Sequence, residues 1–281
     1  MDPFNLIVDA PYLRWAVLAG AVGLVLFAAR ADLNWAKVVR QGALVTAAYF
    51  AYFLVRGLTE GSVERAVANA WRIVDLEEAL GLFHEERLQA RIVEYQWVVD
   101  LSNWIYIWGH WPVIVTVALW LLLRHERQFL LYRNAFLISG AIGLVIFATF
   151  PVAPPRLIDL NLVDTVTEHS RSYRVLQPPA LVNQYAAVPS LHFGWNLLIG
   201  IALWQNSRFL ATRVFAVTLP ILMAFAIVLT GNHFIVDAFA GAAVALLGLL
   251  IAANWRRFRW RPAPSRSYEA QPRGNTAMSP R

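Results

Sequence analysis

The sequence predicts an all-α membrane protein, a polytopic bundle of six or seven transmembrane helices with an amphipathic outer segment. Composition is the first reason: of 281 residues, 58% are hydrophobic and only 15% are charged, and the mean hydropathy is +0.49. Soluble domains carry about 25% charged residues. The second reason is that apolar residues gather into runs of about 20, the length that crosses a bilayer as a helix.

Seven apolar runs could cross a membrane. The first two are the weakest, because Arg40 and Arg56 lie close together at the ends of the second run and Arg14 and Arg30 do the same for the first. Pro112 falls inside the third run and predicts a kink there. The runs cover residues 12–29, 40–56, 99–123, 134–151, 190–206, 213–231 and 233–254.

Two long segments between the runs differ in character. Residues 60–96 are polar but keep a helical rhythm of apolar positions, which predicts one or two amphipathic helices on the outer membrane surface or, equally, helices packed on the bundle. Residues 151–189 contain six prolines and cannot form one helix. Long irregular loops in compact proteins are usually functional. The predicted domains are therefore a membrane-embedded unit, 1–255, and a basic, disordered cytoplasmic tail, 256–281.

The basic residues predict the orientation. Segments 30–40, 124–133, 207–213 and 254–281 hold 15 of the 24 Lys and Arg residues. By the positive-inside rule these segments are cytoplasmic, and the loops between them lie outside. The net charge of +6 thus reflects membrane topology and not a nucleic-acid partner. The chain has no cysteine, which excludes disulfides, thiolate metal sites and thiol nucleophiles.

An ionisable pair opens the last run. Asp237 is the only acidic residue between Glu168 and Glu269, and a carboxylate at membrane depth is costly enough to need a partner. His233 lies four positions earlier, on the same face of a helix. The carboxylate can hold one imidazole nitrogen and leave the other for a substrate. A purely structural pair at a helix start is the alternative.

A second histidine opens the fifth run, in Pro189-Ser190-Leu191-His192. The runs that begin at His192 and His233 both start on the predicted outer side, so their N-terminal ends should face one cavity. Such ends attract anions, and phosphate above all. Arg156 leaves the fourth run on the same side and can donate two hydrogen bonds to a phosphate.

These motifs resemble those of the type 2 phosphatidic acid phosphatase (PAP2) superfamily, which also contains vanadium haloperoxidases. The narrower resemblance is to the branch with the fungal inositol phosphorylceramide synthases. Pro189-Ser190-Leu191-His192 matches the family's second motif and His233-x-x-x-Asp237 its third, while only Pro155-Arg156 remains of the first. The motif core spans residues 151–241.

The resemblance implies the catalytic residues. His233 would be the nucleophile that takes the phosphoryl group, and Asp237 would orient it. His192 would protonate the leaving oxygen and then activate the acceptor. Arg156 and Ser190 would bind the phosphate oxygens. No metal or other cofactor is implied.

The sequence departs from the family at three positions. Thr149 and Ile227 stand where the family has Lys and often Arg, and Leu191 replaces a glycine. Arg171 and Arg174 in the outer loop are candidate substitutes for the missing cations, although contact with lipid headgroups is the more ordinary role for them.

A further polar group lies in the third run, where Asn103, Tyr106 and His110 share a helix face. They either line the cavity and read a headgroup or form a buried network that fixes helix packing. His192, His233 and Asp237 could in principle bind zinc, but the helix ends and Arg156 favour phosphate.

The function expected from these observations is a lipid-phosphate phosphatase that works without metal through a phosphohistidine. One alternative is a phosphotransferase that moves a phospho-headgroup, of the inositol-phosphate type, to a lipid alcohol. Another is a non-catalytic lipid-phosphate binder or transporter. The expected partners are a membrane lipid phosphate and a lipid or polyol acceptor. We expect a multi-pass plasma-membrane protein of a bacterium, with its site on the extracytoplasmic side.

Overall fold

The computed structural model describes residues 35–58, 62–166 and 183–259. These residues form nine α-helices and no β-sheet, which confirms the all-α class. The helices are α3 (Trp35–Leu58), α4 (Val63–Leu80), α5 (Glu85–Ile92), α6 (Gln96–Trp108), α7 (Trp111–Arg124), α8 (Glu126–Thr149), α11 (Leu191–Asn206), α12 (Leu210–Leu229) and α13 (Ile235–Arg259).

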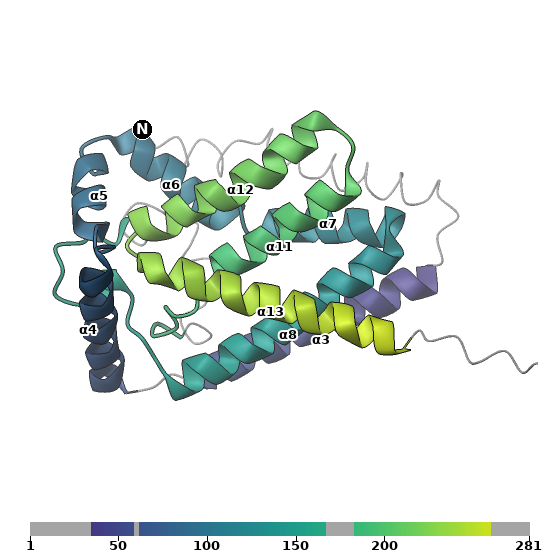
Figure 1. Cartoon of the computed structure of the whole chain (residues 1–281), viewed down its shortest axis with the longest axis horizontal. Helices are drawn as coiled ribbons and strands as arrows, with labels where there is room; N and C mark the ends of the chain where they lie inside the picture. The colour runs from purple at the N-terminus through teal and green to yellow at the C-terminus, as the bar shows by residue number, and fades with distance from the viewer. Residues whose placement is uncertain (1–34, 59–61, 167–182, 260–281) are drawn as a thin grey trace, which may run out of the picture.

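The long helices lie side by side as a bundle, and α4 and α5 lie across one end of it (Figure 1). Helices α11 and α13 begin at that end, and α8 and α12 finish there. The opposite end carries the turns from α7 to α8 and from α11 to α12, together with the last turn of α13. The two histidine motifs therefore lie at the same end of the bundle, as the sequence predicted.

Three described helices are long and apolar enough to span a membrane: α8, α12 and residues Ile235–Trp255 of α13. The pair α6–α7, which bends by 41°, is a fourth candidate if the two helices form one broken span. The bend lies at Gly109 and His110, and Pro112 occupies the first turn of α7, so the predicted kink is confirmed. The chain is thus a multi-pass membrane protein. The count of six or seven crossings stays a prediction. Run 12–29 lies outside the described residues, and α3 and α11, which cover runs 40–56 and 190–206, are not among the candidate spans.

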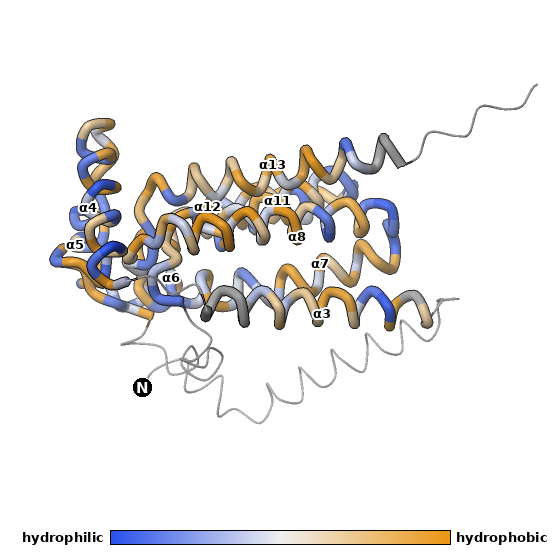
Figure 2. The backbone as a smooth tube through the Cα atoms, turned by 90° about the horizontal axis from the view of Figure 1, so that it is seen from below, coloured by the Kyte–Doolittle hydropathy of each residue, from blue (hydrophilic) through white to orange (hydrophobic). Residues whose placement is uncertain are grey.

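Residues 60–96 form two helices, α4 and α5, packed on the bundle end and coloured in mixed blue and orange in Figure 2. Only some of the apolar residues that give these helices their predicted rhythm are buried. Ala66, Ala70, Ile73 and Val74 are buried, but Leu76 and Leu80 are 44% and 58% exposed. Polar side chains take their place inside: Asn69, Glu77, Glu85 and Gln89 are all buried. The inward face of α4 and α5 therefore combines apolar and polar side chains. Asn69 and Gln89 donate from it to backbone carbonyls of the segments that connect the long helices.

Helices α11 and α13 approach each other through two glycines. A Cβ atom on Gly194 would lie 2.4 Å from the carbonyl oxygen of Gly241, and one on Gly241 would lie 2.1 Å from that of Ser190. Both distances are far below van der Waals contact, so only glycine fits at these two positions. The close crossing brings the beginnings of α11 and α13 together, and with them the two histidine motifs.

Candidate functional site

Backbone hydrogen bonds connect the three predicted motif segments. Val152 pairs with Ala186 in an isolated parallel bridge. The N–H of Arg156 donates to the Gly231 carbonyl over 3.1 Å, and the N–H of Ser190 donates to the Asp237 carbonyl over 3.0 Å. These bonds fix the loop after α8, the start of α11 and the start of α13 relative to one another. Gly231 has a φ of +69°, which ends α12 in a left-handed turn that favours glycine.

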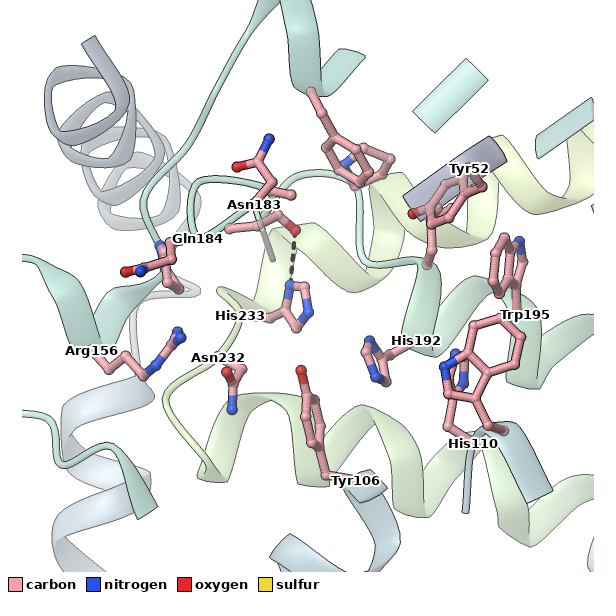
Figure 3. Close-up of a pocket in the computed structure, with 17 residues that line it drawn as sticks. Tyr52, Tyr106, His110, Arg156, Asn183, Gln184, His192, Trp195, Asn232 and His233 are labelled. Carbon is pink, nitrogen blue, oxygen red and sulfur yellow. Dashed lines mark hydrogen bonds between the residues drawn. The ribbon is translucent and has the colours of Figure 1, made fainter. Parts of the chain in front are cut away.

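The His233 imidazole is held through one nitrogen. Its Nδ1 lies 2.8 Å from the Ala187 carbonyl oxygen, the dashed line in Figure 3, and 3.2 Å from Oδ2 of Asp237. A carbonyl oxygen can only accept, so Nδ1 must carry the proton and donate it. In the neutral ring, Nε2 then holds the free lone pair. His233 lines a cavity together with His192 and Arg156.

Asp237 is completely buried and plays two roles at the start of α13. Its Oδ2 accepts from Nδ1 of His233 and from the backbone N–H of Phe234, 3.0 Å away. Phe234 is the residue before the helix, so Asp237 is its third residue and closes the back-bond of a capping box. The sequence prediction that His233 and Asp237 pair is confirmed, although the helix begins only after His233.

The His192 ring lies between two aromatic rings. It stacks on Tyr106 at a centroid distance of 4.4 Å and on His110 at 4.2 Å. Asn196, one turn further along α11, donates to the His192 carbonyl over 2.8 Å and lies 3.0 Å from Nδ1 of His110. The ring centroids of His192 and His233 are 6.3 Å apart. One phosphate group can therefore contact both imidazoles.

Arg156 enters the cavity from the other side of His233 (Figure 3). Its Nε donates to Oδ2 of Asp164 over 2.9 Å, and both side chains are mostly buried. This bond uses one edge of the guanidinium and leaves the terminal nitrogens for another ligand. Of the described residues that line the cavity, Arg156 is the only Arg or Lys.

The other predicted residues differ in whether they reach the cavity. Tyr106 and His110 line the cavity. Asn103 does not: its amide exchanges two 2.9 Å hydrogen bonds with Thr165 and ties α6 to the loop. Ser190 is fully buried and its Oγ accepts from the N–H of Phe193, as a helix cap. Arg171 and Arg174 lie outside the described residues.

The structure also locates the two positions that lack the family's cations. Thr149 is exposed at the end of α8, where its hydroxyl donates to the Val145 carbonyl. Ile227 is fully buried in an apolar cluster with Ile105 and Met223. Neither side chain lines the cavity, so neither position could supply a cation without rearrangement.

Sequence reasoning missed several residues of the site. Asn183, Gln184, Trp195 and Asn232 also line the cavity, as Figure 3 shows. An apolar groove bounded by α3, α7 and α8 adjoins it and shares three lining residues: Tyr52, Trp111 and Trp195. The polar cavity and the apolar groove thus lie on either side of the same three aromatic side chains.

The comparisons with known proteins agree with this geometry. The family model of the PAP2 superfamily matches residues 71–251, which is well over half of the chain. The chain belongs to the PAP2 superfamily. The match includes every residue that lines the cavity except Tyr52 of α3. It supports a membrane phosphatase or phosphotransferase. It gives no support to a particular branch. No curated protein and no solved structure matches the chain.

Proposed function

We propose that this PAP2-superfamily protein is an integral membrane lipid-phosphate phosphatase that works through a phosphohistidine at His233. One observation carries the proposal: Nδ1 of His233 donates to Ala187 and Asp237, which leaves Nε2 unprotonated in a cavity shared with His192 and Arg156. A deprotonated nitrogen held by a buried carboxylate is the arrangement that makes imidazole a nucleophile.

In the proposed first step, Nε2 of His233 attacks phosphorus and an N–P bond forms while the P–O bond to the lipid breaks. The lipid oxygen leaves with a proton from His192. In the second step, water attacks phosphorus and gives its proton to His192, and the N–P bond breaks to release phosphate. Asp237 stabilises the positive charge on His233 between the two steps.

The negative charge of the transferring phosphoryl group needs donors. Arg156 is the candidate for this role, because Asp164 fixes its Nε and leaves its other nitrogens available. The beginning of α11 adds its dipole, since Pro189, Leu191 and His192 line the cavity. Ser190 contributes by capping that helix end and not, on this geometry, by direct contact. Arg171 and Arg174 remain proposed additional cations.

A lipid substrate is supported by the apolar groove that adjoins the cavity. Its lining is almost entirely apolar and includes Val45, Tyr49, Ile114, Leu121, Phe129 and Phe136. The phosphate of a lipid could lie at His233 while its chain passes Tyr52 and Trp111 into this groove. A soluble phosphate ester would have no use for such a surface.

The decisive experiment is phosphate release by the purified protein from phosphatidate and from a polyprenyl diphosphate. We expect turnover by the wild type and a loss on the order of 10⁴-fold in His233→Ala, because the nucleophile is absent. Asp237→Asn should lose less, since the imidazole remains. Brief incubation with ³²P-labelled substrate should leave acid-labile label on the wild type and none on His233→Ala.

The same experiment separates the alternatives. Phosphate transfer that requires an added lipid alcohol or inositol would identify a phosphotransferase, as in the inositol phosphorylceramide synthase branch. Binding without turnover of any phosphate ester would identify a non-catalytic binder or transporter. Turnover by His233→Ala at the wild-type rate would rule out the covalent mechanism.

A further inference from the structure

Helix α13, which begins just after His233 and contains Asp237, donates two of its N-terminal hydrogen bonds to carboxylates of distant helices. The N–H of Ile235 donates to Oε1 of Glu85 over 2.8 Å, and that of Val236 donates to Oε1 of Glu77 over 2.6 Å. The first N–H groups of a helix normally donate to the side chain of its own capping residue. Here the capping position is Phe234, which has no side-chain acceptor, so carboxylates of α4 and α5 accept these bonds.

Glu77 and Glu85 lie near a third buried carboxyl group, that of Asp237. Glu77, Glu85 and Asp237 are each 0% exposed. Among the described residues, His233 is the only cation-forming side chain paired with any of the three. Three carboxylates cannot all stay ionised in such a place. At least one of them must hold a proton.

The hydrogen bonds identify the group that holds it. Glu85 accepts two backbone N–H groups, those of Ile235 and His84, so both of its oxygens already act as acceptors. Glu77 accepts only one, and its buried Oε2 finds no N–H or O–H donor among the described residues. Burial raises the pKa of Glu77 to about 9, with a contribution from the neighbouring Glu85. The proton therefore belongs to Glu77 and is donated to Glu85.

We propose that Glu77 and Glu85 are positioning residues that share one proton, clamp the first turn of α13, and hold the His233–Asp237 pair in place. The effect of this clamp on catalysis rests on the proposed function. The titratable groups that face Glu77 are Glu85 on α5 and Asp237 on α13, with His233 behind Asp237. Loss of the shared proton at alkaline pH sets two like charges side by side, which separates the helices and displaces the catalytic pair.

Glu77→Ala and Glu77→Gln test the clamp as a pair. Alanine leaves the Val236 N–H without its acceptor and Glu85 without its donor, so phosphate release should fall at least about tenfold. Glutamine mimics protonated Glu77: its carbonyl accepts from Val236 and its amide donates to Glu85 at every pH. It should restore activity at pH 7 and remove the alkaline decline of the wild type. Glu78→Gln, an exposed neighbour on α4, is the control and should keep the wild-type pH profile.

Thermal unfolding in detergent gives a readout that needs no activity. The pKa of folded Glu77 lies above the ordinary 4.5, so between these values the folded protein holds a proton that the unfolded chain has lost. The stability that this proton provides is complete below pH 4.5 and is lost as the pH rises to about 9. The Tm of the wild type should fall over this range more steeply than that of Glu77→Gln.

Each outcome decides between the two proposals. Equal Tm slopes for wild type and Glu77→Gln, or failure of Glu77→Gln to fold, would overturn the clamp whether or not phosphate is released. An unchanged alkaline decline of activity in Glu77→Gln would also overturn it. Different Tm slopes without any phosphate release would support the clamp and overturn the proposed function.

Discussion

Gly241 of α13 packs directly against the backbone carbonyl of Ser190, the residue that caps α11. A Cβ atom at position 241 would lie 2.1 Å from that oxygen. Gly241→Ala must therefore push the starts of α11 and α13 apart. Because the N–H of Ser190 also donates to Asp237, the shift reaches the catalytic pair. We expect a destabilisation of about 1–3 kcal/mol or more, together with a severe loss of phosphate release.

A matched control is available for this prediction. Gly42 of α3 has no atom within 4 Å of the position that a Cβ would take. Gly42→Ala should be neutral or stabilising by up to about 1 kcal/mol, since alanine is the better helix former. Thermal unfolding and phosphate release should be measured on both variants. Equal effects of the two substitutions would contradict the close crossing.

The bond between Asp164 and Arg156 predicts a difference between substitutions of similar size. Arg156→Lys keeps the charge but replaces the planar guanidinium fork with one small ammonium, which loses the separate donor edges for Asp164 and a phosphate. We expect it to lower kcat/KM by about 10²-fold or more, as loss of a transition-state donor does. Asp164→Asn keeps an oxygen that can accept from Nε, so it should lose much less than Asp164→Ala. Similar losses in Asn and Ala variants would argue that Asp164 does not orient the guanidinium.

Vanadate and a chelator test the proposed chemistry from opposite directions. Vanadate adopts the trigonal bipyramid expected when Nε2 of His233 attacks phosphorus, so it should inhibit as a transition-state mimic. Activity should survive EDTA without added Mg²⁺, because Arg156 and the α11 helix end are proposed to supply the positive charge. Loss of activity in EDTA that a divalent ion restores would point to a metal-assisted reaction.

The part of the site that sequence predicted correctly is the local part. His233 and Asp237 are four residues apart, and the back-bond from Asp237 to Phe234 spans three. Spacing of this kind is fixed by helical geometry, whatever the rest of the chain does. The helix start at Ser190 was predicted for a similar local reason, since serine is a residue type that caps helices.

The part that sequence could not predict depends on distant contacts. Glu77 follows Ile73 and Val74 by four and three residues, so its spacing puts it on the buried face of α4. What periodicity does not record is its partner there, the backbone N–H of Val236, 159 positions away. Asn103 shows the converse. Its spacing predicts a helix face shared with Tyr106 and His110, but α6 ends before His110, and Thr165 takes the hydrogen bonds of the Asn103 amide.

The last prediction concerns the face of the membrane on which the site opens. The turns from α7 to α8 and from α11 to α12, which belong to predicted cytoplasmic segments, lie at one end of the bundle, and α4 and α5 lie at the other (Figure 1). His192 and His233, which line the cavity, stand where α11 and α13 begin, at the α4–α5 end. By the positive-inside rule the site should open to the extracytoplasmic side. In this cysteine-free chain, Glu94→Cys marks the α4–α5 end and Phe209→Cys, at a residue that is 78% exposed, marks the opposite turn. An impermeant maleimide should label Glu94→Cys in intact cells, and Phe209→Cys only after permeabilisation. The reverse pattern would move the substrate to the inner leaflet, while the geometry of His192, His233 and Asp237 would stay as described.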